Sequence, residues 1–189
     1  ASAIDLAAST VSGNLPATAG GAITQSGALL VTAGTTSLAA GTGNDITLAG
    51  ANNFATVSVV SGNNVTLRDG TGGIELGAST VSGNLGVTST GGNITDSGDL
   101  SVTGNAFFNA GASAVTLGDA TAANFGTLTF VGGAVTITEN SDTQLSGQSS
   151  AGTLTLSSAG ALTNDATANV SVSGNANFSA SSIALVGAR

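Results

Sequence analysis

The chain has 189 residues, a net charge of −8, 29 Gly and six Phe, and it lacks Cys, His, Met, Trp and Tyr altogether. Only two residues are cationic, which excludes the basic footprint that a nucleic-acid-binding protein needs. Without His or Cys, metal sites and nucleophilic triads built on those side chains are also excluded. No apolar run reaches the length of about 18 residues typical of a membrane-spanning helix, so we expect no transmembrane segment.

Short apolar–polar–apolar triplets, separated by turns rich in Gly and Asn, follow one another from the start of the chain. Ile4–Leu6 (IDL) and Val65–Leu67 (VTL) are examples. Side chains alternate across a strand, so the apolar residues of each triplet face inward and the polar residue faces solvent. The alternation is too short-ranged for a helix, and Gly, Asn, Ser and Thr oppose helix formation. The pattern predicts an all-β chain of strands of about three to five residues, with little or no helix.

The triplets belong to a longer repeat. The segment 9–15 (STVSGNL) returns letter for letter as 79–85, and Asn53-Phe54 matches Asn124-Phe125. The shift between the first two copies is 69 to 71 residues. Self-similarity at a fixed period predicts a solenoid or another repeat architecture, and an unfinished copy favours an open-ended stack. We therefore expect a single β-solenoid over residues 1–189 with internal repeats 1–73, 74–142 and 143–189, the third incomplete.

Each copy divides into about three coils of about 23 residues, each coil with three strands, so the chain should form about eight coils. Stacked strands would pair in parallel about 4.8 Å apart. Bends such as Gly83-Asn84 suit left-handed backbone conformations, and Asn14 and Asn84 predict a partial inward ladder of amides. The phenylalanines expected to fill the core are Phe54, Phe108, Phe125, Phe130 and Phe178.

The sequences of several segments resemble the strand repeats of large bacterial surface proteins of the filamentous-haemagglutinin type. The segments are STVSGNL, GGNITDSGDLSVTGNAFFNAG, NNFATVSVVSGNNVTL and NFGTLTFVGGAVTI. The resemblance covers essentially the whole chain and carries no catalytic motif. It implies a right-handed parallel β-helix, secreted and displayed on or near a bacterial cell, that acts as a spacer, an adhesive surface or a biofilm component.

Acidic residues are the remaining candidates for chemistry. Asp96 with Asp99, and Glu139 with Asp142, are close pairs of the kind that cleaves glycosides, but their neighbours are Ser, Gly and Asn. No aromatic platform for a sugar accompanies them, so we interpret both pairs as solvated turn charges. We expect no catalytic residues and no enzymatic activity.

Calcium is the one cofactor that the sequence leaves open. The segment 41–48 (GTGNDITL) resembles one nonapeptide of a calcium-binding β-roll, but the neighbouring sequence does not repeat at nine residues. Asp45, Asp96 and Asp99 are therefore weak calcium candidates, and otherwise we expect no cofactor or metal.

These observations favour a structural or adhesive β-solenoid segment of a secreted bacterial surface protein or extracellular filament. Apolar triplets lie close to both termini, so we expect the ends to join further repeats of the same chain or another copy, end to end. The alternative is a carbohydrate- or surface-binding module on the side of the rod, with host or biofilm glycans as partners. Ice binding by outward Thr residues and polysaccharide cleavage are less favoured.

Overall fold

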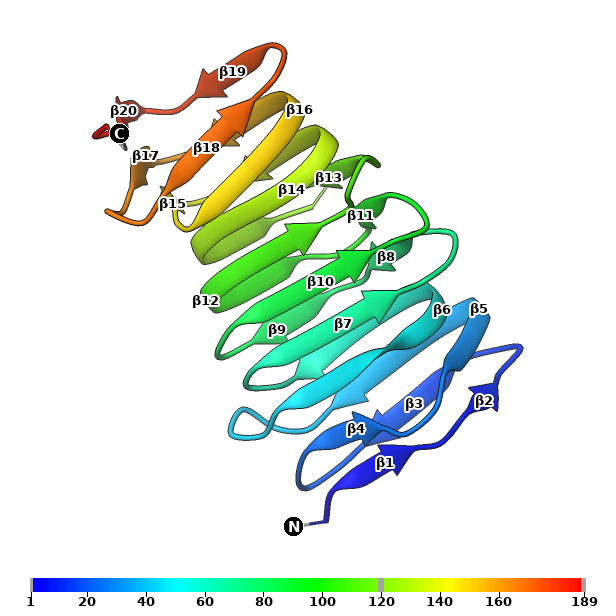
Figure 1. Ribbon diagram of the computed structural model, residues 1–189. Coiled ribbons are helices and arrows are strands. Elements are labelled where there is room, and N and C mark those ends of the chain that lie inside the picture. Colours follow the sequence, from blue (N-terminus) through cyan, green and yellow to red (C-terminus); the bar gives the residue numbers. More distant parts are fainter. Residues whose placement is uncertain (1, 119–120, 188–189) are drawn as a thin grey trace.

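A computed structural model describes residues 2–118 and 121–187 (Figure 1). These residues form twenty β-strands and no helix, which confirms the expected all-β class. None of them belongs to a helix long and apolar enough to cross a membrane. The strands are β1 (Ile4–Leu6), β2 (Ser9–Thr10), β3 (Leu15–Thr18), β4 (Ile23–Gln25), β5 (Leu29–Ala39), β6 (Ile46–Ser61), β7 (Val65–Asp69), β8 (Ile74–Leu76), β9 (Ser79–Val81), β10 (Leu85–Ser89), β11 (Ile94–Asp96), β12 (Leu100–Asn109), β13 (Val115–Leu117), β14 (Ala123–Glu139), β15 (Thr143–Leu145), β16 (Gln148–Ser158), β17 (Ala161–Asn164), β18 (Asn169–Val172), β19 (Ala176–Ser179) and β20 (Ser182–Ala184).

The strands stack into a parallel β-solenoid, as the repeat predicted. One column shows the principle: Ile74 pairs in parallel with Ile94, Ile94 with Val115, Val115 with Val135, and Val135 with Leu154. Partners in this column are 19 to 21 residues apart, so the chain makes about nine turns. The expected count of about eight was slightly low because the turns are shorter than the predicted 23 residues.

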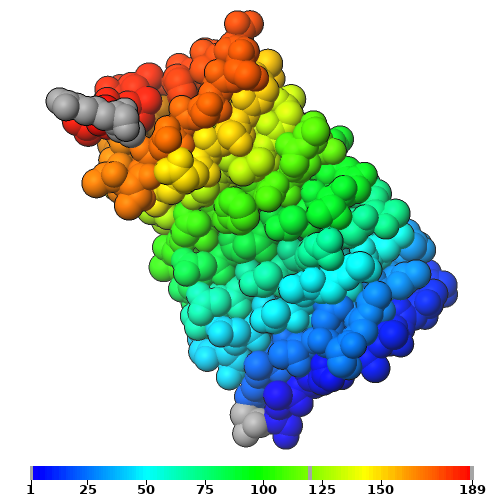
Figure 2. All heavy atoms as spheres, in the orientation of Figure 1, coloured from blue at the N-terminus to red at the C-terminus, as the bar shows by residue number. Residues whose placement is uncertain are grey.

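Several strands continue around the corners of the solenoid. We expected strands of three to five residues, whereas β6 has 16 residues and β14 has 17. Pairing survives the corners through local shifts of register, such as the one between Leu48 and Asn52 in the pairing of β6 with β7. The result is a rod of stacked turns, about 40 Å long at about 4.8 Å per turn, with the two described ends of the chain at opposite ends of the rod (Figures 1 and 2).

The core is the narrow interior of the rod, and the alternation within the triplets sets which side chains fill it. Val65 and Leu67 are buried while Thr66 between them is exposed, as predicted. The inward phenylalanines Phe54, Phe108, Phe125 and Phe130 are buried, and the rings of Phe108 and Phe125 contact each other with centroids 5.5 Å apart. Phe178 is only half-buried because it belongs to the last described turn, where no further described turn covers it.

The Gly-Asn bends differ from the expectation. No described non-Gly residue has a positive φ, and neither Gly83 nor Gly104 does, so these bends are not left-handed. Glycine is needed there for close approach instead: a Cβ on Gly83 would lie 2.7 Å from Oδ1 of Asn64 in the turn below. The correction has a local cause: at Gly83 the side-chain oxygens of Asn63 and Asn64 in the turn below come close, whereas a Cβ on Gly13 or Gly43 would meet nothing within 4 Å.

The asparagines at these corners form a ladder along the rod. Oδ1 of Asn64 accepts a hydrogen bond from the N–H of Asn84 (3.1 Å), and Oδ1 of Asn84 accepts one from the N–H of Asn105 (2.8 Å). Asn14 makes the equivalent bond to the N–H of Thr35 (2.9 Å). The predicted ladder therefore exists, but it lies at the surface rather than inside: each side chain caps the backbone of the turn above it.

Both ends of the rod present strands with one open edge within the described residues. At one end β1 pairs only with β4, and at the other β18 and β19 pair only with β16 and β20 only with β17. The last turn also exposes apolar side chains, with Ile183 52% and Val186 76% exposed. These open edges are the feature that most needs a functional explanation.

Candidate functional site

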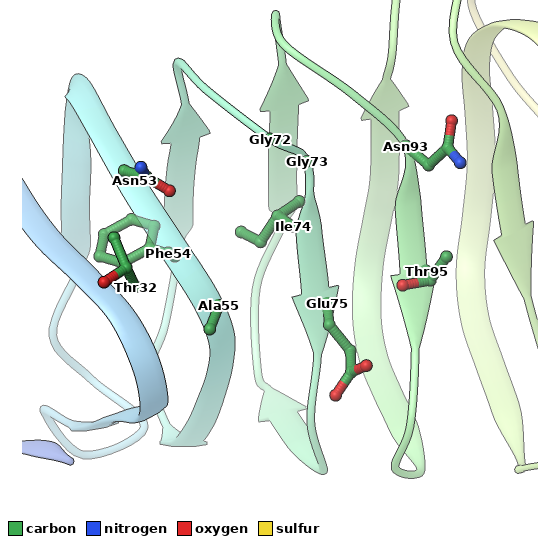
Figure 3. Close-up of a pocket in the computed structure, with 10 residues that line it drawn as sticks. All are labelled: Thr32, Asn53, Phe54, Ala55, Gly72, Gly73, Ile74, Glu75, Asn93 and Thr95. Carbon is green, nitrogen blue, oxygen red and sulfur yellow. The ribbon is translucent and has the colours of Figure 1, made fainter. Parts of the chain in front are cut away.

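A groove of about 380 Å³ on the side of the rod crosses several turns (Figure 3). Strands β6, β8 and β11 supply most of its lining, from segments that lie far apart in the sequence. The lining residues are Thr32, Asn53, Phe54, Ala55, Gly72, Gly73, Ile74, Glu75, Asn93 and Thr95. The groove is open and mostly polar, so it could take a ligand that forms hydrogen bonds.

Glu75 is the only ionisable side chain in this lining. It faces outward from β8 because its neighbours Ile74 and Leu76 face the core. Its Oε1 atom accepts hydrogen bonds from the hydroxyl of Thr56 in the turn below (3.2 Å) and from that of Ser97 in the turn above (2.7 Å). The carboxylate thus links three turns while it borders the groove.

Asn93, at the edge of the groove, uses only part of its hydrogen-bonding capacity within the rod. Oδ1 of Asn93 accepts a bond from the N–H of Ala114 (2.9 Å), so this residue belongs to the corner caps, and its amide nitrogen makes no hydrogen bond to the residues that the structure describes. Cleavage of a glycosidic bond normally uses two carboxyl groups, and the lining supplies one. The arrangement therefore suits binding better than acid–base catalysis.

Gly72 and Gly73 form the part of the lining that carries no side chain, with φ of 94° and 96°. A Cβ on Gly73 would lie 2.6 Å from the carbonyl oxygen of Asn93. We expect Gly73→Ala to lower the free energy of unfolding by roughly 1–3 kcal/mol, from backbone strain and this collision. Urea unfolding measures the loss. The matched control is Gly13→Ala, where a Cβ meets nothing within 4 Å; equal losses at both positions would contradict the explanation.

The three calcium candidates serve as caps in the described structure. Oδ1 of Asp45 accepts bonds from the N–H of Asn64 (3.0 Å) and from the amide of Asn63 (3.0 Å), and these hydrogen bonds lower the pKa of Asp45. Asp96 accepts from the N–H of Gly118 (3.1 Å) and Asp99 from that of Ala122 (2.9 Å).

Asp96 and Asp99 lie on neighbouring parts of one turn, whereas Asp45 lies on an earlier turn of the rod. Within residues 2–118 and 121–187, no three acidic side chains gather in a way that would hold a metal ion. Calcium binding at these residues therefore stays a prediction from the sequence alone.

Glu139 and Asp142 lie in different environments. Asp142 is exposed, and its Oδ1 atom accepts a bond from the N–H of Ala161 (2.8 Å), which fits the expected turn charge. Glu139 is only 1% exposed, so its interpretation as a solvated turn charge was wrong. The alternation along the strand could have predicted this burial, because Val135 and Ile137 face inward and Glu139 follows at the same spacing of two residues.

Sequence reasoning also missed Asp69, which is buried at the corresponding place in the previous copy. Its Oδ2 atom accepts a bond from the N–H of Phe54 (2.7 Å), just as Oε2 of Glu139 accepts one from the N–H of Phe125 (3.2 Å). Burial raises the pKa of Asp69, opposed by bonds from backbone N–H groups. Burial raises the pKa of Glu139 further, to about 7. Both acids support the fold from inside and lie outside the groove.

Comparison with known proteins identifies the repeat but no function. Residues 1–61, 62–131 and 132–189 each match one family model, described as repeats of unknown function (DUF5649). These boundaries fall at a different phase of the repeat from the copies 1–73, 74–142 and 143–189 expected above. No curated protein and no solved structure gave a match.

Proposed function

Because the chain belongs along its whole length to the DUF5649 family of repeats, we propose that it acts as a structural rod whose ends are continued by further turns of the same kind. The single observation that carries the proposal is the pair of open edges at the two ends of the solenoid. In a solenoid each turn contacts only its neighbours, so one more turn on an end completes the same interface again.

The interior of the rod shows how an end would be covered. The last turn contains Val170–Val172, which matches Leu100–Val102 in the preceding copy. There the strand is covered by the next turn, with Leu100 paired to Ala123 and Val102 to Phe125. A further turn of this type would pair with the open edge of β18 and bury the exposed Ile183 and Val186. It could come from the same chain or from a second copy.

Sedimentation of the 189-residue protein over a range of concentrations tests end-to-end association. We expect association that Ile183→Lys weakens by about tenfold, because a charge would enter the apolar joint. Val60→Lys is the matched control, because Val60 is 58% exposed on the side of the rod, much like Ile183 at 52%. A protein that stays monomeric at high concentration, or equal effects of both substitutions, would count against the proposal.

The resemblance to filamentous-haemagglutinin-type proteins supports a setting for such a rod. We propose that it is part of a secreted bacterial surface protein or extracellular filament, where it serves as a spacer, adhesive surface or biofilm component without catalytic activity. Continuous ladders of backbone hydrogen bonds and a thin apolar core suit a mechanical role. The two cationic residues of the chain also leave trypsin few sites to cleave.

Carbohydrate or surface recognition by the side of the rod is the second candidate function. The observation that favours it is that polar grooves such as the one in Figure 3 lie between neighbouring turns, with side chains from several turns at their edges. A pure spacer should show no saturable binding to glycans, whereas a recognition module should.

A further inference from the structure

A second groove, of about 350 Å³, lies on another face of the rod, where β7, β10 and β12 run side by side. Phe107 lines it and faces outward, whereas its neighbour Phe108 is fully buried in the core. Phe107 is half-buried, so part of its ring borders the groove. An aromatic side chain on the outer face of this polar rod needs a reason.

The architecture does not supply that reason. The register pairs Phe107 with Gly86, and the corresponding pairs in the other copies are Ser37 with Pro16 and Asn177 with Thr155. The same outward position is thus filled by Ser or Asn elsewhere, and those turns stack in the same way. Aromatic side chains are enriched in binding surfaces and in the lining of ligand sites, so a half-buried Phe at this outward position fits a place where a ligand binds.

Packing of the ring over Gly86 would be a structural explanation, because aromatic side chains can cover a glycine on a neighbouring strand. The structure does not show it. A Cβ built on Gly86 meets only the carbonyl oxygen of Val65, at 3.9 Å, so the ring of Phe107 does not fill the space above this glycine. The space remains open as part of the groove, beside the ring.

Two amides of the corner ladder border the same groove. Oδ1 of Asn84 accepts a hydrogen bond from the N–H of Asn105, and Oδ1 of Asn105 accepts one from the hydroxyl of Thr127 (2.9 Å). These bonds fix both side chains. Their amide nitrogens make no hydrogen bond to any described part of the chain, so their hydrogens are held in place and available to an acceptor on a ligand.

We propose that this groove binds a neutral saccharide, with the apolar face of a sugar ring against Phe107 and its hydroxyls accepting hydrogen bonds from Asn84 and Asn105. An apolar platform beside a few fixed polar groups is the usual composition of a small-ligand site. No residue that lines the groove is charged, and the chain as a whole carries −8, so an acidic sugar would find no partner and be repelled. The proposal rests on the second candidate function, carbohydrate recognition by the side of the rod, and locates that recognition in this groove.

Titration of the isotope-labelled 189-residue protein, followed by ¹H–¹⁵N correlation NMR spectra, tests the site. The probes are the methyl glycosides of glucose, galactose, mannose and N-acetylglucosamine, with glucuronic acid and N-acetylneuraminic acid as acidic probes. We expect saturable shifts from at least one neutral probe, centred on the amides of residues 64–66, 84–86 and 105–107. The acidic probes should bind at least about tenfold more weakly.

Two substitutions separate binding from folding. Phe107→Ser places the residue of the first copy at this position, and Gly86→Thr that of the third. Gly86→Thr fills the groove while the ring is kept, and it should not destabilise the strand, because its Cβ has room. Each should weaken binding about tenfold or more with the urea midpoint kept. Asp142→Asn, at an exposed position outside both grooves, is the control and should leave binding unchanged.

The outcomes distinguish the site from the function. Binding of a neutral sugar with shifts elsewhere, for example around Glu75, would overturn the site and keep carbohydrate recognition. Equal or tighter binding of the acidic probes would overturn the neutral ligand class. No binding by any probe would overturn both the site and the second candidate function, and it would leave the structural rod unaffected.

Discussion

Replacing Asn52 by alanine should lower the free energy of unfolding by about 3–5 kcal/mol, one of the two largest effects that we expect. Asn52 is completely buried. Its Oδ1 atom accepts bonds from the N–H of Leu29 (2.9 Å) and from Gln25 (2.8 Å). Its amide nitrogen lies within hydrogen-bonding distance of three acceptors, which share its two hydrogens: the carbonyl oxygens of Leu48 (3.1 Å) and Arg68 (3.1 Å) and the side-chain oxygen of Gln25 (2.9 Å).

These bonds reach both the turn below and the turn above, because Leu29 belongs to β5 and Arg68 to β7. Alanine would leave a cavity and several buried polar groups without a partner, each at a cost of about 1–3 kcal/mol. The next residue provides the control: Asn53 is half-buried at the groove, and Asn53→Ala should cost less than about 1 kcal/mol.

Urea unfolding followed by circular dichroism gives the stabilities of Asn52→Ala and Asn53→Ala. Hydrogen exchange should also show the loss locally, with faster exchange at the amide of Leu29, because solenoids can open turn by turn. If Asn52→Ala and Asn53→Ala were equally mild, the amide of Asn52 would not hold the three turns together in the way that the geometry indicates.

Much of the architecture could be predicted because short-range alternation and the long repeat both report on stacking. The inward orientation of Val65 and Leu67 followed from the alternation of apolar and polar residues, and the parallel stacking of strands followed from the long sequence repeat. Asn52 could not be predicted in this way. Its counterpart in the second copy is Ala123, which has no side-chain amide. The N–H of Ala123 donates to Oδ1 of Asn140 (3.1 Å). The repeat therefore does not place a buried amide at the same position in each copy.

Other features failed to emerge for physical reasons that differ from residue to residue. Gly83 predicted a left-handed bend, but the close approach of Asn63 and Asn64 from the turn below explains this glycine, and contact between turns cannot be seen in the sequence of one turn. The grooves required three-dimensional information, because Asn53, Glu75 and Asn93 come together only once the lengths of the turns are known. Glu139 was within reach, since the alternation placed it inward.

The buried carboxyl of Glu139 should make the stability of the rod depend on pH. Its Oε2 atom accepts one bond, from the N–H of Phe125, while Oε1 and the hydroxyl of the nearby Thr143 are buried without a hydrogen bond of ordinary geometry. The Thr143 hydroxyl still lies near enough to lower the pKa somewhat, but burial dominates and raises it from 4.5 to about 7. Between about pH 4.5 and pH 7, the carboxyl of Glu139 therefore keeps its proton in the folded state and loses it in the unfolded state.

A raised pKa in the folded state means that the neutral carboxyl favours folding. Its contribution is fully present below about pH 4.5 and is lost as the pH rises through about 7. The difference between the two pKa values corresponds to a total loss of roughly 3 kcal/mol, at about 1.4 kcal/mol per pKa unit. Asp69, whose pKa is also raised by burial, should add a loss of the same sign.

Glu139→Gln isolates the effect, because the amide keeps the shape of the neutral acid and cannot ionise. We expect the wild type and the variant to be similarly stable near pH 5, and the variant to be more stable by roughly 2–3 kcal/mol near pH 8. Urea unfolding at both values measures the difference. Asp142→Asn removes an exposed acid three residues away and should show no such gain. A constant difference between the wild type and Glu139→Gln across this range would mean that Glu139 is ionised in the folded rod at pH 5. Its carboxylate would then need a buried partner that the surrounding side chains do not provide.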